Sequence, residues 1–303
     1  MRRTFAYLLI GVAACFLVLA PLLRFWVVPT IVKAPLDQFT ETVSEAPGAT
    51  YLDTSTLSIS EGRTLVATRT VRGDVAAGSD DTAVWDVFVK VVDPDKAGES
   101  AQDRIVTATT DRVAFDRRTQ EAVSCCGEAL NGSAAEHEGI EYKFPFGAEK
   151  KTYQYFDTTI GRATPMEYQG SETIQGVNVY RYEQRIEPEA ISELDVPGSL
   201  IGSTEASVPV ERFYSNTRRV WVEPDSGVIV KGQEQQFSTL RDDSGEDVLT
   251  VTEATLTFND RTVRNQADTA KDAARQISLL GAIGPLVLLL LGLIALVAGV
   301  VLA

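Results

Sequence analysis

The chain has 303 residues, with 42 acidic and 28 basic side chains and a formal net charge of −14 at pH 7. This acidity argues against nucleic-acid binding, which needs clustered lysine and arginine, so we expect no nucleic-acid partner. Three cysteines are too few for a disulfide-rich scaffold, and a hydrophobic content of 44% is typical of a folded chain rather than a disordered one.

The N-terminal segment is apolar. Phe5–Leu23 contains 19 residues without a charge, about the length that crosses the roughly 30 Å core of a bilayer. We predict a cytoplasmic N-terminus at 1–4 and a transmembrane helix at 5–28. Pro21 directly follows the small-residue site at Ala20 and should block signal cleavage there, so we expect an uncleaved anchor.

The acidic charge is confined to the middle of the chain. Lys33–Arg275 contains all 42 acids and 25 of the 28 bases, so it carries a net charge of −17. Arg2 and Arg3 favour a cytoplasmic N-terminus, because basic residues stay on the cytoplasmic side of the membrane. We therefore expect a plasma-membrane protein with two spans, both termini cytoplasmic and an extracytoplasmic central domain.

Alternating segments between turn residues fill 37–260, which we predict to be the extracytoplasmic β domain. Ala83–Val92 alternates in polarity, and Arg104–Phe115 follows it after a turn rich in Asp, Pro and Gly. Glu223–Gly227 predicts a hairpin connection, and Pro188–Leu200 a loop or short helical excursion. The predicted fold is mainly β: an antiparallel meander or half-barrel of roughly eight to twelve strands, flanked by N- and C-terminal transmembrane helices.

The C-terminal segment is helical and then apolar. Arg261–Arg275 is rich in alanine and has neither Gly nor Pro, which predicts a helical linker at 261–276. Ile277–Ala303 contains 27 residues without a charge, enough to span a bilayer with some tilt. We predict a second transmembrane helix at 277–303, continuous with the linker.

The sequence carries no catalytic or metal-binding motif. It has no Gly-x-Ser-x-Gly, no His-Glu-x-x-His and no phosphate-binding loop, so we expect no enzyme activity, no cofactor and no metal site. The single histidine, His137, lies between Glu136 and Glu138, whose carboxylates could raise its pKa or recruit a metal. Its polar surroundings favour the simpler interpretation that His137 is an exposed loop residue.

Cys125 and Cys126 are adjacent and are our candidates for a disulfide. An extracytoplasmic domain would expose them to an oxidising compartment. Adjacent cysteines can close only a small strained ring, so a free thiol pair and bridges to other chains remain as alternatives. We favour a structural role over a redox role.

The segment from 142 to 156 is unusually aromatic. Core packing is the default role of such residues, but aromatic side chains also line small-molecule pockets. The candidate ligand-binding residues are Tyr142, Phe144, Phe146, Tyr153 and Tyr155.

Motifs along nearly the whole chain are those of a known family. They are Ala34–Gln38, Arg69–Asp74, Trp85–Phe88, Val113–Thr119, Cys125–Gly127, Tyr142–Phe146, Lys151–Asp157, Tyr214–Arg218 and Trp221–Pro224. Through them the chain resembles the porin PorA family of actinobacterial two-span membrane proteins. The resemblance implies an envelope membrane protein of a high-GC Gram-positive organism and supplies no catalytic residues.

Two functions are consistent with these features. The first is a non-enzymatic, membrane-anchored extracytoplasmic domain that binds a lipid-like ligand or an envelope protein beside the lipid bilayer. The hairpin that starts at Trp221 is similar to that of half-barrel lipid carriers of the cell envelope. The alternative is an oligomeric channel or porin-like membrane protein. Because the spans carry no charge, we expect the ligand-binding function and no ion conduction.

Overall fold

The computed structural model describes residues 2–96 and 100–303. The chain divides into two compact units. Met1–Lys33 and Thr269–Ala303 form a helical unit, and Ala34–Asp268 forms a β domain.

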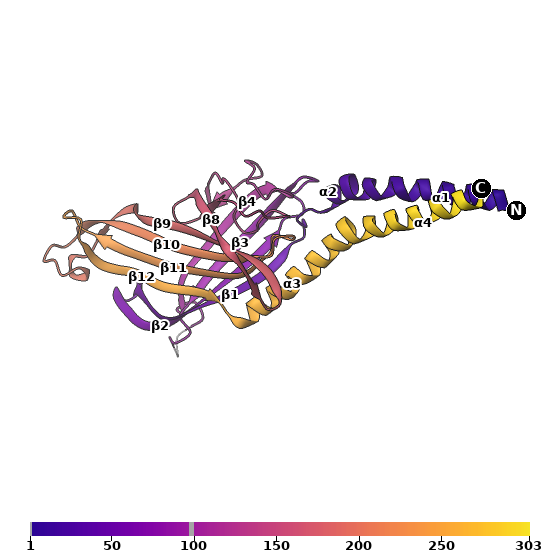
Figure 1. Ribbon diagram of the computed structural model, residues 1–303. Coiled ribbons are helices and arrows are strands. Elements are labelled where there is room, and N and C mark those ends of the chain that lie inside the picture. The colour runs from indigo at the N-terminus through magenta and orange to yellow at the C-terminus, as the bar shows by residue number, and fades with distance from the viewer. Residues whose placement is uncertain (1, 97–99) are drawn as a thin grey trace. The chain divides into compact units, whose positions relative to one another are not determined.

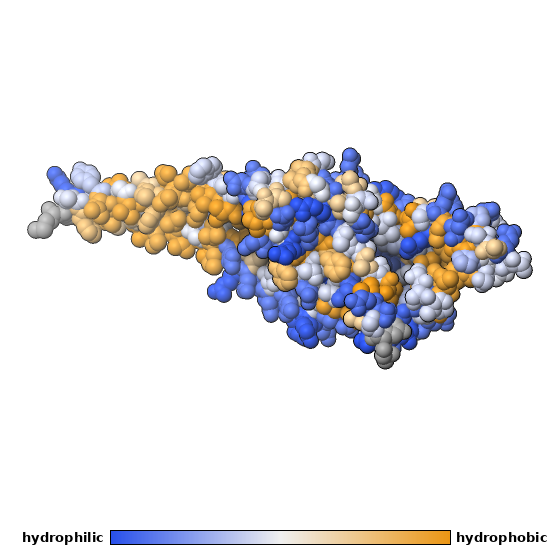
Figure 2. All heavy atoms as spheres, turned by 180° about the vertical axis from the view of Figure 1, so that it is seen from behind, coloured by the Kyte–Doolittle hydropathy of each residue, from blue (hydrophilic) through white to orange (hydrophobic). Residues whose placement is uncertain are grey.

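The helical unit contains the two apolar ends of the chain. Its elements are α1 (Arg2–Leu22), η1 (Leu23–Val27), α2 (Val28–Ile31), the end of α3 (Asp260–Ser278), η3 (Leu279–Ile283) and α4 (Gly284–Leu302). Arg3–Ile31 and Asp260–Leu302 are each one continuous helix, long and apolar enough by length and composition to cross a membrane. Apolar side chains cover most of the visible face of α1 and α4 (Figure 2).

Helices α1 and α4 pack closely because glycine occupies their contact. A Cβ atom at Gly299 would lie 2.8 Å from Cγ1 of Ile10 and 3.1 Å from the carbonyl oxygen of Ala6. A Cβ atom at Gly292 would lie 3.1 Å from Cγ of Leu17. In lipid, such close approach is a main source of helix association, because burying apolar surface there brings little gain.

Replacing Gly299 with leucine should weaken the pairing of α1 with α4. The larger side chain would overpack the contact and cost about 1–3 kcal/mol, which we expect as a lower midpoint in the thermal loss of helical circular dichroism of the full-length protein in detergent. Gly11→Leu is the matched control, because a Cβ atom at Gly11 would meet nothing within 4 Å. Equal effects of the two substitutions would contradict the close contact.

One antiparallel sheet contains all twelve strands of the described residues. They are β1 (Phe39–Asp53), β2 (Ser58–Gly73), β3 (Thr82–Val92), β4 (Ile105–Asp116), β5 (Ala129–Leu130), β6 (Ser133–Ala134), β7 (Tyr153–Asp157), β8 (Arg162–Ile174), β9 (Val177–Val196), β10 (Val208–Val222), β11 (Ile229–Arg241) and β12 (Asp247–Phe258). Their order is β6-β5-β4-β3-β2-β1-β12-β11-β10-β9-β8-β7, and Figure 1 shows β9 to β12 side by side. The predicted mainly β fold between long apolar helices is confirmed.

The prediction of a loop or helical excursion at Pro188–Leu200 is wrong for most of that segment. Strand β9 continues to Val196, and only η2 (Gly198–Leu200) is a short 3₁₀ turn. The pairing of β9 with β10 is irregular around Pro188, where the register shifts between the Tyr214↔Glu189 and Asn216↔Ile186 pairs. A bulge tolerates proline because no ladder hydrogen bond is required there.

Residues 135–152, here called the crossing segment, connect the two end strands of the sheet, β6 and β7. Ile140 forms a parallel bridge with Tyr155. The backbone N–H of Phe144 donates to the carbonyl oxygen of Gly227 in the β10–β11 hairpin. Ile140 and Phe144 belong to the core of β7–β11, whereas Tyr142 packs against the core of β2–β4. The crossing segment therefore packs against both halves of the sheet.

The sheet is curved. Strands β4 and β10 are separated by five strands, which in a flat sheet would place them roughly 28 Å apart. Yet Asp111 on β4 and Arg218 on β10 line the same cavity of about 40 Å³. The inner face therefore brings together side chains from both halves of the sheet.

Candidate functional site

Eight ionisable side chains gather on the inner face of the sheet. We call them the buried charge cluster. Its members are Arg69, Asp111, Glu128, His137, Glu141, Asp157, Arg218 and Glu234. Buried charges are costly unless they are paired and hydrogen-bonded, so the partners of each one decide what the cluster can do.

His137 is buried between two carboxylates, so the expectation of an exposed histidine is wrong. His137 is only 6% exposed to solvent. Nδ1 lies 2.9 Å from Oε2 of Glu128, and Nε2 lies 2.9 Å from Oδ1 of Asp111. The sequence neighbours Glu136 and Glu138 are both exposed. The carboxylates that contact the imidazole are therefore those of Glu128 and Asp111, and not those of its two neighbours in the sequence.

The protonation of this part of the cluster is shifted. Burial lowers the pKa of His137, but hydrogen bonds with Asp111 and Glu128, and their charges, outweigh it and raise the pKa above its usual value. Burial raises the pKa of Glu141 well above its usual value, and the charge of Asp111 raises it further. Both shifts extend the protonated forms of His137 and Glu141 to higher pH than usual.

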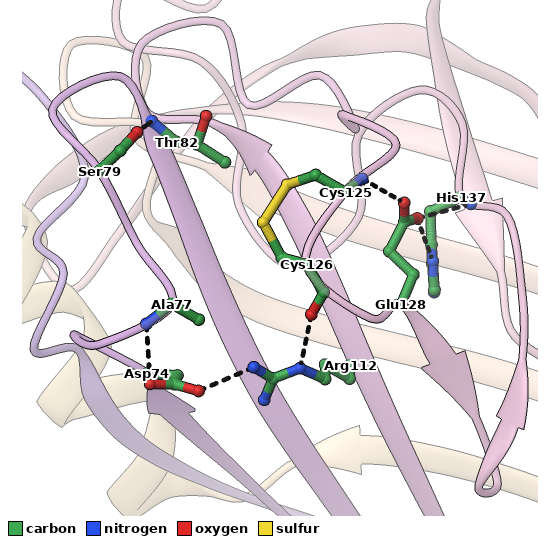
Figure 3. Close-up of a disulfide and its surroundings, with 9 residues drawn as sticks. All are labelled: Asp74, Ala77, Ser79, Thr82, Arg112, Cys125, Cys126, Glu128 and His137. Carbon is green, nitrogen blue, oxygen red and sulfur yellow. Dashed lines mark hydrogen bonds and ion pairs between the residues drawn. A yellow bond between two sulfur atoms is a disulfide. The ribbon is translucent and has the colours of Figure 1, made fainter.

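The disulfide turn beside β4 positions Glu128 (Figure 3). Cys125 and Cys126 form a disulfide in the structure, one of the alternatives open from the sequence. The backbone N–H of Cys125 donates to Oε1 of Glu128 at 3.0 Å, and Nε of Arg112 donates to the carbonyl oxygen of Cys126 at 3.1 Å. The backbone N–H of His137 donates to the other oxygen of Glu128 at 3.0 Å. Glu128 therefore connects the disulfide turn to the histidine.

Arg218 is the centre of the second part of the cluster. Its Nη2 lies 2.8 Å from Oδ2 of Asp157, and its Nε lies 3.2 Å from Oε1 of Glu234. Its Nη1 also donates to Oε1 of Gln184 at 2.5 Å. Burial opposes the charge of Glu234, but Arg218 and Arg69 outweigh it and lower the pKa of Glu234 to about 2.

Glu234 should make the β domain acid-sensitive. Its folded pKa of about 2 lies below the ordinary value of 4.5, so its contribution is fully present above about pH 4.5 and is lost as pH falls towards 2. A shift of this size corresponds to about 3 kcal/mol. The difference in unfolding free energy between wild type and Glu234→Gln, from urea titrations followed by tryptophan fluorescence, should shrink over that range. A difference independent of pH would contradict this assignment.

The candidate ligand-binding residues lie on the crossing segment and β7, mostly inside the protein. Phe144, Tyr153 and Tyr155 are buried in one core cluster, whereas Tyr142 and Phe146 are partly buried. Tyr142 and Tyr155 also line a cavity of about 40 Å³ with Arg69, Asp111, Glu141 and Arg218. That space holds a few water molecules and is far smaller than a lipid. Ligand binding through these residues remains a prediction.

Comparison with known proteins identifies the family. A family model described as Porin PorA matches residues 5–301. The chain belongs to the porin PorA family. A protein named Porin PorA from Corynebacterium amycolatum is 28% identical over an alignment 383 positions long, which covers 99% of this chain and 98% of the relative. A second Porin PorA, from Corynebacterium resistens, is 26% identical over an alignment 404 positions long, which covers 100% of this chain and 97% of the relative.

Membership of the porin PorA family confirms the resemblance seen in the sequence and agrees with the prediction that the chain is not an enzyme. Together with the two candidate spans, it makes the chain a membrane protein of the cell envelope.

Proposed function

We propose that the chain is a subunit of an oligomeric channel of the cell envelope, which is the alternative from the sequence and replaces the expectation of a ligand-binding domain that conducts no ions. The similarity of the chain over its whole length to proteins named Porin PorA supports this function. The proposal includes the predicted topology, with both termini cytoplasmic and the β domain extracytoplasmic. Reporter fusions after Asp95 and after Ala303 should then report opposite sides of the membrane.

The open sheet and the apolar helices favour a pore that forms between the helices of several copies of the chain. In the described residues the sheet ends at β6 and β7, so its strands do not close in the way of a strand-lined porin. The helical unit presents many exposed apolar side chains, among them Leu286, Leu290 and Ile294. One pair of helices cannot enclose a pore, so several pairs would have to associate through these faces.

The β domain should make such a channel select cations. Lys33–Arg275 carries 42 acids and 25 bases, and a surface of one sign concentrates counter-ions at a nearby opening. The apolar helices supply no charged ring of their own. Selectivity would therefore come from the β domain and should weaken as salt screens its field.

Planar-bilayer recording of the purified full-length protein tests this function. We expect stepwise conductance with a preference for cations over anions that declines at high salt. Gly299→Leu, which disturbs the α1–α4 contact, should make channel openings rarer, whereas Gly11→Leu should leave them unchanged. Bilayers that stay silent with wild-type protein would refute channel function.

A second candidate is the binding of an amphipathic, lipid-like ligand by the β domain. One observation favours it: a cavity of about 400 Å³ lined by Tyr51, Asp53, Thr54, Ser55, Lys96, Gln102, Asp103, Ile105 and Val106. This volume lies within the range of small-molecule sites, and its mostly polar lining includes the aliphatic side chains of Ile105 and Val106.

Mass analysis of lipids that co-purify with the full-length protein tests this second candidate. An aspartate in place of Ile105 should reduce the bound lipid, because it places a charge against the apolar part of the ligand. Val75→Asp is the control, since Val75 is 55% exposed and does not line the cavity. Equal lipid recovery from both variants would contradict binding in this cavity, whatever the bilayer recordings show.

A further inference from the structure

Three side chains of the buried charge cluster point their ligand atoms at one another. Asp111 comes from β4, and His137 and Glu141 come from the crossing segment. One ligand atom from each lies within 4.8 Å of the other two. These residues are 6%, 6% and 8% exposed, respectively. One imidazole nitrogen and two carboxylate oxygens at this spacing form a donor set for a metal ion.

A second observation marks the same place. Oε2 of Glu141 is buried and has no hydrogen-bond partner among the described residues. Buried polar atoms without a partner are rare and costly, and each calls for an explanation such as a bound ion. The backbone brings Glu141 here because Ile140, its neighbour, is fixed to β7 through the bridge with Tyr155.

His137 is held in the orientation that a metal ligand needs. Its Nδ1 lies against Glu128, which also accepts the backbone N–H of His137 and that of Cys125. With Glu128 against Nδ1, Nε2 is the ring nitrogen that faces Asp111. Metal-binding histidines usually donate their other N–H to a carboxylate in this way. The hydroxyl of Tyr142 likewise holds the second oxygen of Asp111.

The charge of the cluster also favours a cation. Its five carboxylates, all at least four-fifths buried, face two guanidinium groups, so with a neutral His137 and every carboxylate ionised, as in a metal-bound state, the side chains carry a net charge of −3. The cavity of about 40 Å³ beside Asp111 and Glu141 leaves room for water ligands. A divalent ion would reduce the excess negative charge and would give Oε2 of Glu141 a partner.

We propose that Asp111, His137 and Glu141 bind one divalent transition-metal ion, with Glu128 as the positioning residue of the histidine. The nitrogen ligand favours Zn²⁺ or Mn²⁺ over Ca²⁺, which prefers six to eight oxygen ligands. The ion would join the crossing segment to β4. This inference does not depend on whether the protein conducts ions or binds a lipid.

The test uses the full-length protein in detergent, purified without a histidine tag, stripped with a chelator and titrated with Zn²⁺ alone in a calorimeter. We expect one ion per chain. Glu141→Gln should weaken binding at least about 100-fold by removing a ligand, and Glu128→Gln about 10- to 100-fold by loosening the histidine. Glu136→Gln is the matched control, an exposed acid of the same segment, and should bind as wild type does.

A measurement on the wild-type protein makes the test independent of variant folding. Electron paramagnetic resonance of bound Mn²⁺ should show coupling to an imidazole nitrogen, which must come from His137 because the chain has one histidine. Absence of binding, equal affinity of wild type and Glu141→Gln, or bound Mn²⁺ without imidazole coupling would each overturn the proposal.

Discussion

Replacing Arg218 with methionine should destabilise the β domain by about 3–5 kcal/mol, because it leaves Asp157 and Glu234 buried without their shared cation. Methionine is unbranched and uncharged and has a similar volume, so the loss would reflect pairing rather than volume. Urea unfolding of the full-length protein in detergent, followed by tryptophan fluorescence, measures the effect.

Arg185→Met is the control for this substitution. Arg185 lies on the neighbouring strand β9 and pairs with Glu183, but its side chain is 61% exposed, so its loss should change stability by less than about 1 kcal/mol. The double variant Arg218→Met with Glu234→Gln should recover part of the loss, because one stranded carboxylate becomes neutral. Similar small losses for Arg218→Met and Arg185→Met would show that the buried pairing contributes little.

Gly227→Ala should be nearly as damaging, because the β10–β11 hairpin approaches the crossing segment at this residue. A Cβ atom there would lie 2.0 Å from the carbonyl oxygen of Phe144. The residue also has φ of +71°, a conformation that alanine adopts only with strain. We expect a loss of at least about 3 kcal/mol in the same urea titrations.

Gly161→Ala separates the two causes. Gly161 has φ of +67°, close to that of Gly227, but a Cβ atom there would meet nothing within 4 Å. Its loss should be about 1–2 kcal/mol, from backbone strain alone. If the two substitutions cost the same, the contact between the hairpin and the crossing segment is not what requires glycine at 227.

Local patterns in the sequence predict much of the fold. Alternation in polarity identifies β3, the strand-forming residues after the next turn identify β4, and Glu223–Gly227 has the residues that a tight connection requires. The long apolar ends predict the two helices. The continuation of β9 beyond Pro188 is missed, because a bulge in the partner pairing lets proline remain in the sheet.

The buried charge cluster cannot be predicted in the same way. The sequence neighbours of His137 predict an exposed residue, yet its partners Asp111 and Glu128 approach it only after β4, the disulfide turn and the crossing segment have folded together. Asp111 and Arg218 line one cavity because the sheet curves, and curvature leaves no signature within a short window of sequence. The only sequence feature that distinguishes the crossing segment is its aromatic residues, and they indicate core packing as readily as a binding site.

The pairing of the first strand with the last has a consequence for biogenesis. Asn259, at the end of β12, donates to Glu45 of β1, 214 residues away. Contacts of such long sequence separation form late and slowly. Until β12 emerges from the ribosome, β1 is left as the unpaired edge of a half-built sheet, a template for aggregation. Strand β12 is the last strand of the sheet in chain order, so the sheet can be completed only after β12 has been synthesised, and a chaperone would be needed most during that interval.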